Sequence, residues 1–408
     1  MEKIIAAKYH YWAIACFIIL SILGVMLRWM HVFPLPGFNY SFLLHAHSHF
    51  AFAGWMFFSI VILIAGRIHE SRIPASYRHL FIATLISAFG MLISFSLQGY
   101  KAVSIGFSTL FIFVTYRFTY LILKEKRLKE KLGPVAPPLL IGALFFLCLS
   151  SLGPYALGPL MATGNRNSPL YQNAIYFYLH FQMNGWMLLG ALSLMSSTYL
   201  SGIKTSRSFK RWLNIFIYSH FPLFLIFLLW TNPPGWVWIA AFLASALNLL
   251  SWCVLCMLHK NLFKKLPLLV KASFAAISIK GVFQVLICFP SIAVWVVSDR
   301  SLIIGYIHLI TLGCVMPLII DQFCRSNFFQ RSRIETVNLL FLTGVMFYLV
   351  LLFIQPLFTL FGRSVPHFRL LLLISSLYFL VIGVLYFVKL AGSSYLRETS
   401  DKALVDKF

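Results

Sequence analysis

The stretch HAHSHFAFAGW, residues 45–55, places His45, His47 and His49 in a run that is otherwise apolar. No charged residue follows until Arg67, so the run is long enough to cross the hydrocarbon core of a bilayer. The whole chain has the same character, because 60% of its 408 residues are hydrophobic and only 11% are charged. Soluble domains are far more polar. The composition therefore predicts an all-α, polytopic membrane protein.

Apolar runs of about 20 residues recur along the chain and predict twelve transmembrane helices. They begin near residues 10, 42, 77, 101, 137, 172, 211, 235, 270, 301, 334 and 366. Together they cover almost the whole chain, so we expect a single integral membrane domain, 1–408, with any chemistry between its helices. The first run follows two lysines in the manner of a signal peptide, but it is long enough to span, and we interpret it as a transmembrane helix.

The formal net charge of +23 comes from basic residues that gather in alternate loops. These loops cover residues 67–78, 124–131, 204–211, 260–271 and 325–333, and both termini are basic as well. This is the positive-inside pattern, and it predicts an integral protein of a bacterial inner membrane with both termini in the cytoplasm. The lipid bilayer is then the main partner of the chain, and nucleic acid is not expected.

Three segments share the pattern H-x-x-x-x-G. The pairs are His49 with Gly54, His180 with Gly185, and His308 with Gly313. The histidines are 131 and 128 residues apart and fall on the second, sixth and tenth predicted spans. This near-equal spacing predicts three pseudo-repeats of four helices, approximately 1–135, 136–266 and 267–408.

Each of these histidines lies about seven to eight residues inside its predicted helix, or roughly 10–12 Å at about 1.5 Å per residue, so all three should occupy one layer of the membrane. The glycine leaves room for a flat ligand or a neighbouring helix. A single intramembrane histidine can simply form hydrogen bonds between helices, but three at matched depth favour a cofactor site. Imidazole suits haem iron and copper, whereas the scarcity of carboxylates disfavours magnesium, calcium and di-iron centres.

Twelve helices in three sets of four, with histidines on the second, sixth and tenth, resemble subunit I of the haem-copper oxidase superfamily. The segment HSHFAFAGW resembles the second-helix haem-ligand motif of cbb-type oxidases. It is still more similar to the H-x-H-x-x-x-x-G-[FW] pattern of the NnrS family, twelve-helix haem- and copper-containing membrane proteins associated with nitric oxide metabolism. The segment HLITLGCVM resembles the H-x-x-T-x-G segment of that family's later helices.

The resemblance implies a set of ligands. His47 or His49 would be one axial ligand of a haem, and His308 would be the other, or the sole ligand of a second haem. His180 would correspond to a copper ligand, and His220 in YSHFPL to its partner, although the proline two residues later gives His220 an alternative place at a helix kink. The haem would be b-type, and copper would be a second cofactor.

The chain also departs from the oxidase pattern. Tyr306 stands where the tenth oxidase helix has a second histidine, Ser219 replaces one of an adjacent histidine pair on the seventh, and Asn184 replaces a tyrosine on the sixth. The ligand set for dioxygen reduction, as in a cytochrome oxidase or a nitric oxide reductase, is therefore incomplete. The resemblance implies electron transfer or redox chemistry on nitric oxide or dioxygen, with a redox partner or quinol. The alternative is a metal, haem or proton transporter, or an oxidase-assembly protein without redox chemistry of its own.

His45 lies one helical turn before His49 on the same face, while His47 points away. His45 would therefore bind a metal at a different centre from His47, or only cap the site near the membrane interface.

Three cationic residues complete the candidates. Arg28 and Arg166 could pair with haem propionates, or extend to the lipid headgroups. Lys280 lies about ten residues into the ninth predicted span, where an ionisable residue is a functional candidate by default. We expect it to belong to a proton path, unless a different helix boundary or a pairing with Gln284 explains it.

Overall fold

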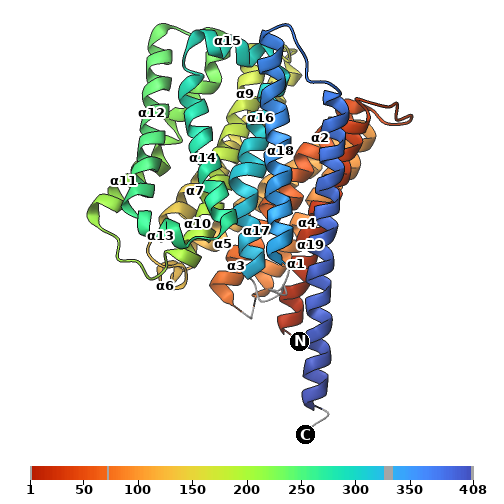
Figure 1. Cartoon of the computed structure of the whole chain (residues 1–408), viewed down its shortest axis with the longest axis vertical. Coiled ribbons are helices and arrows are strands. Elements are labelled where there is room, and N and C mark those ends of the chain that lie inside the picture. The colour runs from red at the N-terminus through yellow and green to blue at the C-terminus, as the bar shows by residue number, and fades with distance from the viewer. Residues whose placement is uncertain (1, 71–72, 326–333, 406–408) are drawn as a thin grey trace. The chain divides into compact units, whose positions relative to one another are not determined.

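The computed structural model describes residues 2–70, 73–325 and 334–405, and the regular secondary structure in these ranges is entirely helical (Figure 1). Eleven helical segments of this described part are long and apolar enough to cross a membrane. They confirm a polytopic, helical membrane protein. Arg72 of the first basic loop, and Arg331 and Arg333 of the last, lie outside the described residues.

The sixth predicted span is helical but is not among the eleven. It continues without a break through α9 (Pro169–His180), the π-helix η2 (Phe181–Met187) and α10 (Leu188–Tyr199). Asparagine and glutamine side chains in its first two parts make it more polar than the other long helices. The count of twelve spans therefore stays a prediction.

The chain forms two compact units: unit 1 comprises residues 1–118 and 319–408, and unit 2 comprises residues 119–318. In unit 1, helices α1 (Glu2–Trp29) and α19 (Phe368–Val405) lie side by side (Figure 1). α18 (Ile334–Leu360) packs on α19, and α2 (Tyr40–Phe50) packs on α1 and on α4 (Ala75–Gln98). The remaining helices of this unit are η1 (Ala51–Phe57), α3 (Phe58–His69), α5 (Ala102–Leu123) and α17 (Met316–Arg325), of which α5 and α17 extend across the boundary.

Unit 2 is built around η2 and α10, which pack on α7. α12 packs on α11, η3 and α14, and α14 in turn packs on η4. The bounds are α6 (Leu128–Leu132), α7 (Ala136–Ser150), α8 (Leu152–Ala162), α11 (Arg207–Ser219), η3 (Pro222–Thr231), α12 (Gly235–Leu258), α13 (Lys260–Lys265), α14 (Leu268–Leu286), α15 (Pro290–Ser298), α16 (Arg300–His308) and η4 (Leu309–Val315). The three expected pseudo-repeats stay a prediction.

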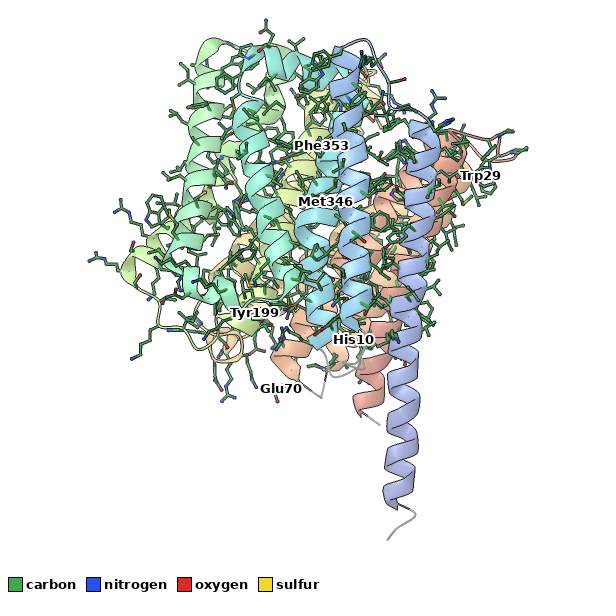
Figure 2. All side chains as sticks on the ribbon, in the orientation of Figure 1. His10, Trp29, Glu70, Tyr199, Met346 and Phe353 are labelled. Atoms are coloured by element: carbon green, nitrogen blue, oxygen red, sulfur yellow. The ribbon has the colours of Figure 1, made fainter. Side chains whose placement is uncertain are left out.

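Large apolar side chains are exposed along the outer faces of the helices (Figure 2). Met346 on α18 is 67% exposed, and Leu97 on α4 is 76% exposed. In contrast, η1 buries six of its seven residues, Phe52 to Phe57, within unit 1. An outer face of this kind needs an apolar solvent, which agrees with a lipid bilayer around the helices.

Three π-helices, η1, η2 and η4, interrupt long helical segments within the described residues. Each is seven residues long and contains the glycine of one H-x-x-x-x-G pair: Gly54, Gly185 or Gly313. The paired histidine lies at the end of the α-helix that precedes it. π-helical turns are rare and occur often at functional sites, because the wider turn displaces side chains from their α-helical positions.

The glycine of η2 lies in a tight helix contact. A Cβ atom added at Gly185 would lie 2.5 Å from Cβ of Phe146 on α7. We therefore expect Gly185→Ala to lower the free energy of unfolding by about 1–3 kcal/mol through overpacking. Gly158→Ala in α8 is the matched control, because nothing lies within 4 Å of the added atom. Thermal unfolding of the detergent-purified variants measures the difference, and equal midpoints would contradict the tight contact.

Candidate functional site

The three histidines of α2 divide between two faces, as their spacing predicts. Asn39 caps the helix by accepting a hydrogen bond from the backbone of Phe42 at 3.1 Å, which fixes where the helix begins. His45 and His49 both contact Tyr100: the His45 ring meets it edge-on at 4.6 Å, and Nε2 of His49 lies 2.8 Å from its hydroxyl.

His47 faces the opposite way, toward α1. A Cβ atom added at Gly24 of α1 would lie 3.6 Å from Cε1 of His47.

Besides its contact with Tyr100, His49 stacks on Phe95 with ring centroids 4.3 Å apart and planes 9° apart. His49 is therefore held by Tyr100 and Phe95, neither of which the sequence motif indicates.

The glycines of the repeated pattern do not leave open space where their surroundings are described. At Gly54 an added Cβ atom would lie 2.8 Å from the ring of Phe50, and at Gly185 the neighbour is Phe146. Gly313 is buried within η4. At the first two positions an aromatic side chain occupies the room that a flat ligand would need, and at Gly185 it belongs to a neighbouring helix, which is the other use predicted for the glycine.

A second group of polar residues lies inside unit 2. It consists of His180, Asn184, His220, Asn248, Lys280, Gln284 and Tyr306, and we call it the buried polar cluster. Its members come from α9, η2, α12, α14 and α16 and from the junction between α11 and η3. All except Tyr306 are less than 3% exposed. Groups this polar need partners when they are buried in an apolar interior.

Asn184 is the centre of this cluster, because its amide bonds in both directions. Its Oδ1 accepts hydrogen bonds from Nζ of Lys280 at 3.1 Å and from Nε2 of Gln284 at 3.4 Å. Its Nδ2 lies 3.4 Å from Nδ1 of His180. Gln284 also donates to the hydroxyl of Tyr306 at 2.7 Å. Lys280 and Gln284 thus share one acceptor, and Gln284 is not the direct partner of Lys280 that the sequence suggested as an alternative.

The two buried histidines of the cluster have different hydrogen-bonding states. Nε2 of His180 donates to the backbone carbonyl of His220 at 2.8 Å, which leaves Nδ1 as the acceptor toward Asn184. Nδ1 of His220 donates to the carbonyl of Phe216 at 2.8 Å. Nε2 of His220 therefore carries the lone pair, and this buried atom has no hydrogen-bond partner.

The place of His220 also agrees with the helix kink proposed from the sequence. α11 ends at Ser219, and the 3-10 helix η3 begins at Pro222. Proline cannot continue the α-helical hydrogen bonding, so the chain changes helix type at this point. Both interpretations of His220 are thus compatible with its position.

His308 closes α16 and is half-buried. Its Nδ1 donates to the carbonyl of Ile304 at 2.8 Å, so its lone pair is on Nε2, as in His220. Metal-ligating histidines commonly donate their other ring nitrogen to a carbonyl in this way.

Unit 2 is poor in acidic residues. Its only three are Glu125, Glu130 and Asp299. Glu130 pairs with Arg127 at 3.5 Å, and Asp299 caps α16 through the backbone of Ser301 at 2.7 Å. The cluster itself contains no carboxylate, so neutral amide oxygen stabilises the Lys280 side chain.

The two arginine candidates lie in different surroundings. Arg28 donates from Nη2 to the hydroxyl of Tyr348 at 2.5 Å, and its guanidinium lies 5.6 Å from the centre of that ring. Arg166 is exposed on the loop between α8 and α9. Arg28 therefore has a partner on α18 that the sequence did not indicate.

Among the described residues, no three histidine, cysteine, aspartate or glutamate side chains are close enough together to hold a metal ion. His45, His47 and His49 are in unit 1, whereas His180, His220 and His308 are in unit 2. In the described part of either unit, a metal would therefore find at most two such side chains together.

Asn248 is the member of the cluster that the sequence motifs missed. Its Nδ2 donates to Oγ of Ser219 at 2.8 Å, next to His220. It lies within the apolar run of α12, where an amide is as unusual as the lysine in α14. Polar residues inside predicted spans were thus the signal that could have found it.

No family model matches the chain, and no similar sequence is found among curated proteins. The chemistry of the site is therefore inferred from its own residues.

Removal of the central amide should destabilise the protein. Asn184→Leu leaves the ammonium of Lys280 and the amide of Gln284 without their shared acceptor, and we expect it to cost about 1–3 kcal/mol of unfolding free energy. In a Lys280→Met background the same change should cost less, because the ammonium is gone. Asn167→Leu in the exposed loop before α9 is the control. Thermal unfolding of the wild type, the two single variants and the double variant tests this coupling, and additive effects would contradict it.

Proposed function

We propose that this chain is a haem-binding integral membrane protein that transfers electrons or reacts with a diatomic gas such as nitric oxide. The observation that carries the proposal is the tautomer of His220 and His308. Each donates Nδ1–H to a backbone carbonyl at 2.8 Å and keeps its lone pair on Nε2. A neutral imidazole in this state is the usual ligand for haem iron.

The residues of unit 2 fit a haem better than a copper centre of the oxidase type. His180 uses Nε2 on the carbonyl of His220, so it offers no lone pair from that nitrogen. Copper in such enzymes needs several histidines around one ion, and the described residues do not bring three together. A haem needs one or two axial ligands. We therefore propose that His308 would hold the haem, with His220 as the second candidate and b-type haem as the cofactor.

The iron of a bound haem would supply the redox chemistry. The chain's own residues would set its surroundings. Asn184 holds Lys280 at one end of a hydrogen-bonded path, and Gln284 connects the same amide to the hydroxyl of Tyr306. Lys280 is the member of this chain of hydrogen bonds whose charge can change, and we propose it as the residue that holds a proton there.

In unit 1, His47 or His49 would be the ligand at a second candidate haem site, and His45 lies on the same face as His49, where both contact Phe95 of α4. Since Nε2 of His49 is bonded to Tyr100, His49 would have to exchange this bond for one to iron. Arg28, at the end of α1, would then neutralise a propionate only by leaving Tyr348.

The resemblance to the NnrS family supports the same proposal, and the loop charges support an inner-membrane location with both termini in the cytoplasm. A quinol or a small redox protein would supply electrons. The alternative is a transporter of protons, metal or haem, or an assembly protein. It is favoured by one observation: a buried ionisable residue such as Lys280 also suits a proton pathway without a redox group.

Spectroscopy tests the proposal. The purified wild-type protein should show a Soret band, and a pyridine haemochrome assay should identify b-type haem. His308→Ala should remove most of the Soret band of unit 2, whereas His79→Ala on the exposed face of α4 should leave it unchanged. Metal analysis of the same samples measures copper.

Two results would contradict the proposal. The absence of a Soret band even after haem supplementation during expression would overturn haem binding altogether. An equal haem content in His308→Ala, His220→Ala and His79→Ala would overturn the assignment to unit 2 and leave the histidines of α2 as the candidates. Proton or metal uptake into proteoliposomes by such a colourless protein would favour the transporter.

A further inference from the structure

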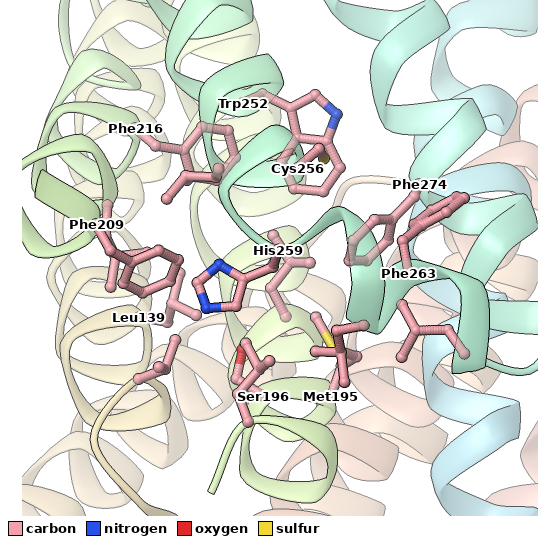
Figure 3. Close-up of a pocket in the computed structure, with 17 residues that line it drawn as sticks. Leu139, Met195, Ser196, Phe209, Phe216, Trp252, Cys256, His259, Phe263 and Phe274 are labelled. Carbon is pink, nitrogen blue, oxygen red and sulfur yellow. The ribbon is translucent and has the colours of Figure 1, made fainter. Parts of the chain in front are cut away.

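Unit 2 contains a cavity of about 70 Å³ whose lining includes no member of the buried polar cluster (Figure 3). It lies where α7, α10, α11, α12, α13 and α14 meet. Its walls are aliphatic and aromatic side chains such as Leu139, Phe209 and Trp252, and its few polar lining groups include Ser196 and His259. An apolar cavity stays dry, so its preferred occupant is apolar.

A larger hollow of about 300 Å³ adjoins this cavity. The two share Cys256, Phe263 and Phe274 as lining residues, and the larger one adds Met257 and Lys260. Met257 is 61% exposed, so this hollow opens at the outer surface of the unit. The opening lies at the end of α12, one of the helices long and apolar enough to cross a membrane.

The polar ring of His259 points into this mainly apolar cavity (Figure 3). It follows the last residue of α12, and its ring meets Phe209 edge-on at 4.6 Å. Its Nδ1 is buried and has no hydrogen-bond partner. Burial lowers the pKa of His259 below its ordinary value, so the ring is neutral at pH 7.

Lys260 lines the larger hollow, and further basic residues lie near it in the sequence. Lys260, Lys264 and Lys265 follow one another on α13 and are exposed. Lys271 at the start of α14 donates to the carbonyl of Lys264 at 3.0 Å. The sequence contains no aspartate or glutamate between Glu130 and Asp299, so this segment brings no acidic side chain to neutralise them.

We propose that this pocket is a binding site for one anionic phospholipid. An acyl chain enters the cavity through the larger hollow, and the phosphate lies against the lysines of α13. Each basic residue near a membrane surface favours an anionic headgroup. His259 forms a hydrogen bond with the ester region between chain and headgroup. The narrow inner cavity, smaller than the ~150 Å³ that accommodates a benzene ring, suits the end of a chain rather than a ring.

Native mass spectrometry of the delipidated full-length protein tests the site. Phosphatidylglycerol and phosphatidylcholine with identical acyl chains are the probes. The wild type should retain one phosphatidylglycerol on the order of tenfold more strongly than phosphatidylcholine. The triple variant Lys260→Gln, Lys264→Gln, Lys265→Gln should lose this preference. The triple variant Lys124→Gln, Lys126→Gln, Lys129→Gln removes the same charge from residues that do not line the pocket, and it should keep the preference.

A steric pair of variants tests the cavity itself. Cys256→Trp places a large side chain in the wall that the cavity and the hollow share, and it should abolish retention of the bound lipid. Cys253 lies one turn earlier on α12 and does not line either space, so Cys253→Trp should leave retention unchanged. Because the α13 lysines are exposed, their triple variant remains informative even if Cys256→Trp does not fold. If the wild type retains the two lipids equally, or if the two triple variants behave alike, lipid binds only to the surface in general. Either result overturns the proposal.

Discussion

The shared acceptor on Asn184 is the interaction on which the interior of unit 2 depends. A lysine at the middle of α14 brings an ammonium group into an apolar bundle, and no carboxylate of the unit lies in that cluster. Burying a charge without a counter-ion is costly, so the amide dipole and the bonds behind it must be held in place. Asn184 is itself fixed because it belongs to η2, which packs on α7. Backbone geometry, helix packing and side-chain polarity are thus coupled at one residue.

The residue type alone does not determine the tautomer or the hydrogen-bond partner of a histidine in this protein. Nε2 of His49 bonds to a tyrosine hydroxyl, Nε2 of His180 bonds to a carbonyl, and in His220 and His308 the protonated nitrogen is Nδ1 instead. Tautomer and partner differ even though His49, His180 and His308 share one sequence pattern. The chemistry available to each imidazole follows from its local hydrogen bonds, and this is why the haem assignment rests on two of them.

Hydropathy predicts where the long helices begin, since apolar runs of membrane length leave the backbone no partner except itself. The beginnings expected near 77, 101, 137 and 235 are within two residues of those observed for α4, α5, α7 and α12. The π-helices were not predicted, because a change from one hydrogen-bond spacing to another leaves the hydrophobic pattern almost unchanged. Tyr100 and Asn248 were missed for a different reason. Their partners lie on other helices, and a single sequence does not say which helices become neighbours.

The three π-helices determine how a change in length would affect the long helices that contain them. A π-turn accommodates one extra residue, and each residue of an α-helix advances the side chains by about 100° around the axis. The half of the helix before the π-turn and the half after it can therefore present different faces to their neighbours. A histidine at the end of α2, α9 or α16 keeps its direction while the apolar half beyond it is rotated independently. Insertion or loss of a single residue at η1, η2 or η4 would thus re-aim one half of the helix without disturbing the other.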